Sequence, residues 1–379
     1  MDHHATTPMD TEVLEAMMPY FLEEFGNPSS NTHDYGHNAR VAVDDARIKL
    51  TKLIGASKPD DIVFTSGATE ADNLVLKGVS AHHRGKKNIN IITTAIEHKA
   101  ILDSAARLQK DGVEIRFVKI DSDGLVDLDN LVEKIDDDTI LISIQTANSE
   151  IGTIQPIAEI GTIAKSKGVF FHTDAVQALG RIEMNVERQN IDMLSISGHK
   201  MYGPKGVGAL YVRRGVKLVP ALDGGGHERG LRSGTLNVPG IVGLGQAAAN
   251  AKRDIEKEIS HCLNLRQRLK DGIESRIADV KLNGHPEKRL PNNLNYAFSD
   301  VEGESLILAC RQVALSSSSA CTSTSAKASY VLKAIGIAQH LAHSSLRIGL
   351  GKGNTEKDVD ILLDLLESGV HRLRSMSSL

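Results

Sequence analysis

Ser195-Ile-Ser-Gly-His-Lys-Met-Tyr-Gly-Pro-Lys-Gly-Val-Gly208 places one lysine, Lys200, directly after a strand-like run and ahead of a glycine-rich turn. The strand-like run covers residues 192–197, so we expect Lys200 at a strand end, with Ser197 and His199 beside it. An amine held there suits Schiff-base chemistry with an aldehyde cofactor. A lysine in a Gly/Pro-rich segment is more often structural or solvated, so this interpretation depends on other motifs.

An acidic residue follows another strand-like run, at residues 168–171, in the segment Phe171-His-Thr-Asp-Ala-Val-Gln177. An acid at the carboxyl end of a strand points into the ligand crevice of an open parallel sheet. Pyridoxal phosphate needs a carboxylate on its ring nitrogen, because the protonated ring takes up electrons from a substrate carbanion. Asp174 is the candidate carboxylate, and Gln177 would lie near the phenolic oxygen of the ring. The alternative is that Asp174 only caps the next helix.

A third motif, Phe64-Thr-Ser-Gly-Ala-Thr-Glu70, leads from a strand-like run at residues 61–64 into a helical pattern. Backbone N–H groups and hydroxyls at a helix start can bind an anion, and the phosphate of the cofactor is a suitable one. A simple helix cap is the alternative. The residues at this helix start are Ser66, Gly67, Ala68 and Thr69.

A fourth motif, Ala95-Ile-Glu-His-Lys99, puts His98 after the strand-like run at residues 90–94. His98 could stack on an aromatic cofactor ring or transfer protons, although an isolated histidine usually does neither. Polar groups at four strand ends, with the lysine last, favour one shared site.

Two further segments complete a pattern that runs from residue 2 to the C-terminal helix: Gly224-Gly-Gly-His-Glu-Arg-Gly-Leu-Arg-Ser-Gly-Thr235 and Ser316-Ser-Ser-Ser-Ala-Cys-Thr-Ser323. Together with the motifs above and Asp2-His-His-Ala-Thr-Thr-Pro8, they resemble the cysteine desulfurases of the IscS/NifS type, which are fold-type I pyridoxal-phosphate enzymes. The resemblance covers essentially the whole chain. It implies an α/β fold whose large domain has a mostly parallel seven-stranded sheet, beside a smaller α+β domain.

The order of strand-like and helical patterns agrees with that fold. Strand-like runs at 61–64, 90–94, 139–145, 169–173, 193–197 and 208–212 alternate with helical patterns such as 70–79, 98–110 and 157–167. A long helical pattern at 241–277 precedes shorter strands at 293–298, 313–316 and 345–350 and helices at 302–311 and 356–375. We predict a large cofactor-binding domain at 13–255 and a small domain formed by 1–12 and 256–379.

Composition excludes several other classes of protein. With 379 residues, 41% of them hydrophobic, the chain can bury a large core. No segment has the apolar length of a membrane span, and the N-terminus lacks signal-peptide regions, so we expect a cytoplasmic protein. A formal net charge of -4 does not favour direct nucleic-acid binding.

The three cysteines, Cys262, Cys310 and Cys321, form no even disulfide framework and are not spaced for a metal site. A reducing compartment is the simplest inference. Cys262 lies in a long helical pattern and Cys310 follows an apolar run, so we expect both to be packing residues or incidental. Cys321 has serine and threonine neighbours on both sides, which predicts an exposed polar loop and a reactive thiol.

The resemblance implies a specific reaction, in which L-cysteine becomes L-alanine. Lys200 would hold the cofactor and then act as a base, while His98 stacks on the ring and handles protons. The Cys321 thiolate would take the sulfur as a persulfide and pass it to an acceptor. The expected acceptor is an iron–sulfur scaffold protein of the IscU type, or another sulfur acceptor that serves tRNA thiolation. No metal site is expected within the chain, although Cys321 could lend one ligand to a transient cluster.

The resemblance also assigns binding residues. Arg347, in Ser344-Ser-Leu-Arg-Ile-Gly349, would bind the substrate carboxylate, with a structural salt bridge as the alternative. Asn27 would lie near the substrate. Thr235 would reach the cofactor phosphate of a neighbouring subunit, which implies a homodimer. Within the chain, the phosphate would be held by Ala68, Thr69, Ser197 and His199.

Two positions depart from the family pattern. Ser149 stands where the family usually has a second asparagine, and Ser318 replaces a glycine in the cysteine loop, where serine restricts φ. Two other functions remain as alternatives at this point. One is the same cofactor with another substrate, as in a selenocysteine lyase or an aminotransferase; the other is a scaffold that has lost turnover and docks a partner.

Overall fold

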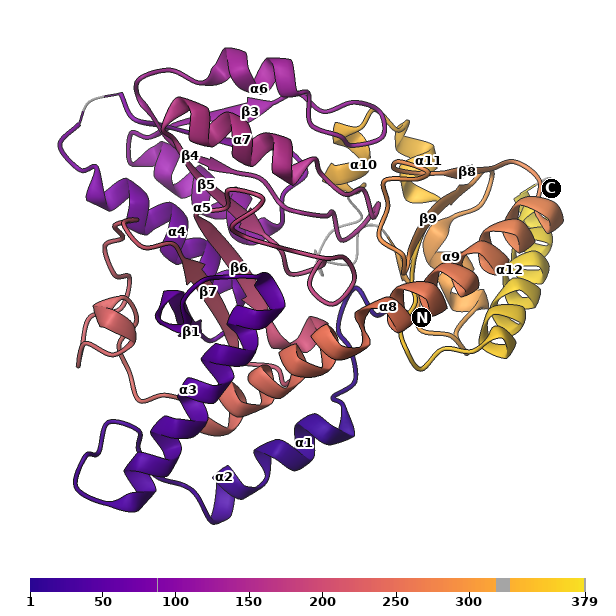
Figure 1. The fold of residues 1–379 in the computed structure, drawn as a ribbon. Coiled ribbons are helices and arrows are strands. Elements are labelled where there is room, and N and C mark those ends of the chain that lie inside the picture. Colours follow the sequence, from indigo (N-terminus) through magenta and orange to yellow (C-terminus); the bar gives the residue numbers. More distant parts are fainter. Residues whose placement is uncertain (87, 318–327, 378–379) are drawn as a thin grey trace.

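The computed structural model describes residues 1–86, 88–317 and 328–377, and it contains two separate β-sheets joined by a long helix (Figure 1). The larger sheet has seven strands in the order β1-β7-β6-β5-β4-β2-β3. Its strands are β1 (Ile62–Thr65), β2 (Asn90–Thr94), β3 (Glu114–Val118), β4 (Thr139–Ser143), β5 (Phe170–Asp174), β6 (Met193–Ser197) and β7 (Gly208–Val212). Strand β7 pairs antiparallel with β1 and β6 and the other pairings are parallel, so the prediction of a mostly parallel seven-stranded sheet is confirmed.

Helices cover both faces of this sheet, which explains why its central strands read as continuous apolar runs. Successive residues of a strand pack into different cores: Ile91 lies with α4 and α5, whereas Ile92 lies in the core of the opposite face. One face is covered by α4 (Ala68–His82) and α5 (Lys99–Lys110), and the other by α3 (Asp34–Ile54), α7 (Ile157–Lys167) and the first part of α8 (Val238–Arg276).

The smaller sheet is antiparallel, in the order β10-β11-β9-β8. Its strands are β8 (Val280–Leu282), β9 (Asn293–Phe298), β10 (Ser316–Ser317) and β11 (Ser345–Gly349). It shares one core with the last turns of α8, α9 (Gly303–Ala309) and α12 (Glu356–Ser377), and Cys310 is buried there. The strand expected at residues 313–316 is shorter and later, because Val313 closes a turn onto Cys310 after α9.

Helix α8 runs without a break from the larger sheet to the smaller one (Figure 1). The domain boundary that we expect near residue 255 therefore falls inside a helix, and it stays a prediction. The first residues of the chain reach the smaller sheet, where Asp2 forms a bridge with Gly349. Within the described parts of the chain, no helix is long and apolar enough to cross a membrane.

The parallel strands β2, β4, β5 and β6 end at the same edge of the sheet, and each is followed by polar residues. A buried glutamate, Glu97, ties two of these ends together. The hydroxyl of Thr94 donates to Glu97 Oε1 over 2.6 Å, and the backbone N–H of Gln145 donates to Oε2 over 2.9 Å. Burial raises the pKa of Glu97 to about 8, which the negative charge of Asp174 reinforces. The residue after this anchor is His98.

We predict that Glu97→Gln gains stability relative to the unchanged protein as pH rises from about 5 to about 8. An unfolded glutamate loses its proton near pH 4.5, whereas folded Glu97 keeps its proton to about pH 8. The folded state therefore binds the extra proton in this window, and this group lowers the free energy of unfolding by about 1.4 kcal/mol per pH unit. Urea unfolding at several pH values measures the slope.

The exposed Glu256→Gln variant is the matched control, and its slope should equal that of the unchanged protein. If Glu97→Gln differs from the unchanged protein by the same free energy at every pH, the buried carboxyl does not hold the proton.

Candidate active site

A cavity of about 720 Å³ lies at the edge where the parallel strands end, and it also reaches residues of the smaller sheet. Most of the side chains expected at the site line this one cavity. They are Ala68, Thr69, His98, Asp174, Gln177, Ser197, His199, Lys200 and Arg347. Residues from strand ends far apart in the sequence thus meet around one volume, which is large enough for a small organic cofactor together with a substrate.

Lys200 follows β6 in a single turn of 3-10 helix, Gly198–Lys200. Its ammonium donates to the backbone carbonyl of Ala5 over 2.7 Å and also to that of His4. Both carbonyls belong to the N-terminal segment, which runs beside this turn. The amine is therefore held inside the cavity by the first residues of the chain.

Asp174 is the last residue of β5, and its carboxylate accepts the backbone N–H of Val176 over 2.9 Å. Burial raises the pKa of Asp174, while the nearby His98 and Lys200 act to lower it. Behind it on α4, the fully buried Asp72 lies 3.7 Å from His172 Nε2. Burial and the charge of Asp174 raise the pKa of Asp72 well above its usual range, so the deeper carboxyl retains its proton.

The start of α4 forms an anion cradle on another side of the cavity. Its N-cap, Gly67, has φ 155, and a Cβ at that position would meet open space. Gly208 of β7 makes this arrangement possible, because a Cβ there would lie 2.7 Å from Gly67 Cα. The first N–H groups of a helix have no acceptor within the helix, so they are available to an anion. Burial lowers the pKa of His199, which also faces the cavity, to about 4.

His98 is the N-cap of α5, and its Nδ1 accepts the backbone N–H of Ala100 over 3.1 Å. Because Nδ1 is engaged as an acceptor, the proton of a neutral ring lies on Nε2. The imidazole is exposed and lines the cavity, so Nε2 is the nitrogen that can exchange protons with a ligand.

Arg347 enters the cavity from β11 of the smaller sheet. One guanidinium nitrogen, Nη2, lies 2.8 Å from Asp2 Oδ1, and Nη1 donates to the backbone carbonyl of Ser149 over 3.4 Å. The hydroxyl of Ser316 donates to the other oxygen of Asp2 over 2.7 Å. Arg347 therefore makes an ion pair and also faces the cavity. The structure is compatible both with a structural salt bridge and with a role in binding the substrate carboxylate.

His4 lines the cavity as well, although no role is expected for its side chain from the sequence alone. Its Nδ1 donates to Gln177 Oε1 over 2.9 Å, and its Nε2 accepts from Asn293 Nδ2 over 3.1 Å. Burial lowers the pKa of His4 to about 3, so the ring is neutral. The motif at residues 2–8 carried the signal for His4 and Asp2, but no pattern assigns their side chains a partner some 170 to 350 residues away.

Two expected residues, Asn27 and Thr235, are not among the described residues that line the cavity. Asn27 is exposed, and its side chain accepts the backbone N–H of Ser29 over 3.0 Å. Thr235 is exposed, in a segment that Arg232 attaches to Glu70 over 2.8 Å. Cys321 and the departure at Ser318 lie outside the described residues. Among the residues that are described, no group of three or more His, Cys, Asp or Glu could hold a metal ion.

Comparison with known proteins gives one consistent result. The family model described as "Aminotransferase class-V" matches residues 1–362. A "Cysteine desulfurase IscS" of Anaeromyxobacter dehalogenans is 52% identical over 381 aligned positions, which cover 100% of this chain and 94% of that protein.

Solved structures agree with the sequence relatives. A "NIFS-LIKE PROTEIN" has a TM-score of 0.91 and 39% identity, with 98% of both chains covered. A second structure, "SspA in complex with cysteine", has a TM-score of 0.82 and 36% identity over 93% of this chain and 99% of that one. The chain belongs to the class-V aminotransferase family and, within it, to the cysteine desulfurases.

Proposed function

We propose that this chain uses pyridoxal phosphate to convert L-cysteine to L-alanine and leaves the sulfur on Cys321 as a persulfide. The observation that carries the proposal is the meeting of Lys200, Asp174 and the α4 cradle around one cavity. Family membership supports the same reaction, because the relatives are named for it. One structural neighbour, SspA, was solved in complex with cysteine.

The lining residues fit the cofactor. Lys200 would hold it through its amine, Asp174 would face its ring nitrogen, and the first turn of α4 would hold its phosphate with Ser197 and His199. The open space at Gly67 leaves room for the phosphate against the backbone. When bound, pyridoxal phosphate supplies an electron sink for the carbanion that forms at the substrate's α-carbon.

Charge indicates which residue would bind the substrate carboxylate. Arg347 offers a planar guanidinium, which a carboxylate accepts well, and the carboxylate of L-cysteine would compete there with Asp2. Lys200, once its amine is released, and His98 through Nε2 are the groups that can take and return protons. Sulfur transfer breaks the carbon–sulfur bond of the substrate and forms a sulfur–sulfur bond on Cys321, and a proton completes L-alanine.

The other two cysteines are poor candidates for this step. Cys262 and Cys310 are both buried, as expected, and burial raises the pKa of each thiol, that of Cys310 to about 11. A thiol in such surroundings is rarely the reactive thiolate. The proposed recipient of the sulfur is an iron–sulfur scaffold protein of the IscU type or an acceptor for tRNA thiolation. A cytoplasmic location stays a prediction from the sequence.

We predict that Lys200→Ala abolishes both the visible absorption of the cofactor complex and sulfide release from L-cysteine. Cys321→Ala should keep the absorption but lower sulfide release by at least about a thousandfold, because the nucleophile is lost while the cofactor site is intact. Spectroscopy and a combined alanine and sulfide assay measure the two effects. Mass spectrometry locates the added sulfur, and its appearance only on Cys262 or Cys310 would show that Cys321 is not the acceptor.

Arg347→Lys should raise the KM for L-cysteine by about 10- to 100-fold with a smaller change in kcat. Lysine keeps the positive charge but loses the two-donor fork that binds a carboxylate. Initial rates over a range of L-cysteine concentrations separate the two constants. An unchanged KM would favour the alternative in which Arg347 only pairs with Asp2.

We also propose that the chain forms a homodimer through an apolar surface near its N-terminus. Helices α1 (Thr11–Met17), α2 (Pro19–Leu22) and α3 follow one another along the chain (Figure 1). They and the segments between them expose large apolar side chains. Leu22 is 74% exposed and Phe25 67%, with Leu14, Met18 and Phe21 nearby in the sequence. Several large apolar side chains exposed in one part of the chain are characteristic of an interface. The exposure of Thr235, away from its own cavity, suits contact with a partner's phosphate.

Leu22→Glu should shift the chain from dimer to monomer, because a charge would be buried without a partner. Light scattering during size-exclusion chromatography measures the mass. Leu308, which is 71% exposed on α9, provides the matched control, and Leu308→Glu should leave the mass unchanged. A dimer that survives Leu22→Glu places the interface elsewhere.

A further inference from the structure

The turn that carries Lys200 contains a residue in an unusual backbone conformation. Tyr202, two positions after the lysine, has φ 60, in the left-handed region that bulky side chains rarely occupy. Such a conformation costs free energy and persists only where the surrounding contacts fix it. Tyr202 is 5% exposed, so these contacts can be named.

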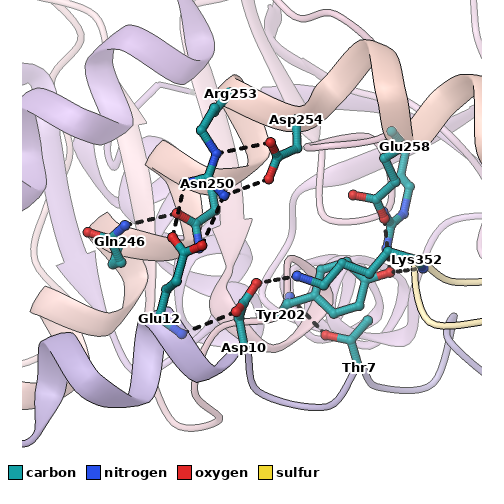
Figure 2. A network of polar contacts seen from close by, with 11 residues as sticks. Thr7, Asp10, Glu12, Tyr202, Gln246, Asn250, Arg253, Asp254, Glu258 and Lys352 are labelled. Carbon is teal, nitrogen blue, oxygen red and sulfur yellow. Dashed lines mark hydrogen bonds and ion pairs between the residues drawn. The ribbon is translucent and has the colours of Figure 1, made fainter.

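The phenol and ring of Tyr202 are held by α8 and by the turn that follows β11, as Figure 2 shows for Glu258 and Lys352. The hydroxyl donates to Glu258 Oε1 over 2.9 Å and accepts the backbone N–H of Lys352 over 2.8 Å. The side-chain nitrogen of Lys352 lies 4.5 Å from the ring centroid, and the guanidinium carbon of Arg181 lies 5.0 Å from it. These contacts fix the side chain but not the backbone of the turn.

The backbone of the turn is held by the N-terminal segment, and above all by Thr7. The Thr7 hydroxyl donates to the carbonyl of His199 over 2.9 Å and accepts the N–H of Tyr202 over 2.8 Å. The backbone N–H of Asp10 then donates to the carbonyl of Tyr202 over 2.9 Å. Thr7 is only 2% exposed. Its single hydroxyl thus bonds His199, just before Lys200, and Tyr202, two positions after it.

We propose that Thr7 is a positioning residue for Lys200. Its hydroxyl spans the lysine-bearing turn, holds Tyr202 in the left-handed conformation, and so sets where the amine enters the cavity. Serine is the substitution that keeps this hydroxyl and both contacts, whereas valine has the same shape without a hydroxyl. The consequence for the cofactor rests on the function proposed above, whereas the consequence for the turn does not.

Hydrogen exchange tests the clamp in the full chain without cofactor. Thr7→Val should raise the exchange rate of the residue-202 amide about fivefold or more, because that buried N–H loses its acceptor. Thr7→Ser should stay close to the unchanged protein. Thr7→Ala removes the same hydroxyl without adding bulk, so it decides the matter if the valine variant fails to fold. An unchanged rate in Thr7→Val or Thr7→Ala overturns the proposal.

Titration of each variant with pyridoxal phosphate, followed by visible absorption, tests the effect on Lys200. Thr7→Val should need about tenfold more cofactor for half-saturation, and Thr7→Ser should restore the original value, because small displacements of a reacting group have large effects. A purely structural role would lower the unfolding temperature and leave half-saturation unchanged, which would overturn the proposal. If the unchanged protein takes up no cofactor, the proposed function fails, while the exchange result still decides whether the clamp exists.

Discussion

Parallel pairing of the central strands is the constraint on which the site depends. In the parallel register His172 lies beside Met193 and Asp174 beside Ser195, so β6 ends two residues beyond the end of β5, at the same edge of the sheet. The acid that ends one strand and the lysine that follows the next are thereby brought to one edge, although 26 positions separate them in the numbering. Helix α4 supplies its first turn to that edge because Gly208 lets β7 approach Gly67 closely. A sheet with the same residues in another register would disperse these groups.

At this edge of the sheet, burial determines which carboxyl groups carry a negative charge. Burial favours the protonated form of Glu97 and Asp72, and it also raises the pKa of Asp174, although His98 and Lys200 near Asp174 act to lower it. The three carboxyls thus differ through their neighbours. His4 and His172 are buried as neutral rings, so they contribute hydrogen bonds rather than charge. Lys200 and Arg347 are basic side chains that face the cavity, where they would meet an anionic cofactor and a substrate carboxylate.

Local patterns predicted the strand ends and therefore much of the site. A strand-like run followed by a polar residue marked Asp174, His98 and Lys200 as candidates. In a parallel sheet each strand and the polar residue after it are neighbours in the sequence, so a short segment is enough to recognise them. What the sequence could not indicate were contacts over long separations. The pairing of Asp2 with Arg347 joins opposite ends of the chain, and the contact of His4 with Gln177 depends on an irregular segment that no periodicity describes. Strand β8 alternates apolar and polar residues, but it is only three residues long and partly exposed, so its pattern is too short to mark a strand in the sequence.

The unbroken course of α8 has a mechanical consequence. A helix of 39 residues extends about 58 Å and resists bending, because each turn is tied to the next by hydrogen bonds. It packs against α3 beside the larger sheet and against α12 beside the smaller one. Both sheets therefore pack against one rigid helix, and the distance between Lys200 and Arg347 depends on the stiffness of that helix. A substrate would then bind between two parts of the chain whose separation is nearly fixed before it arrives.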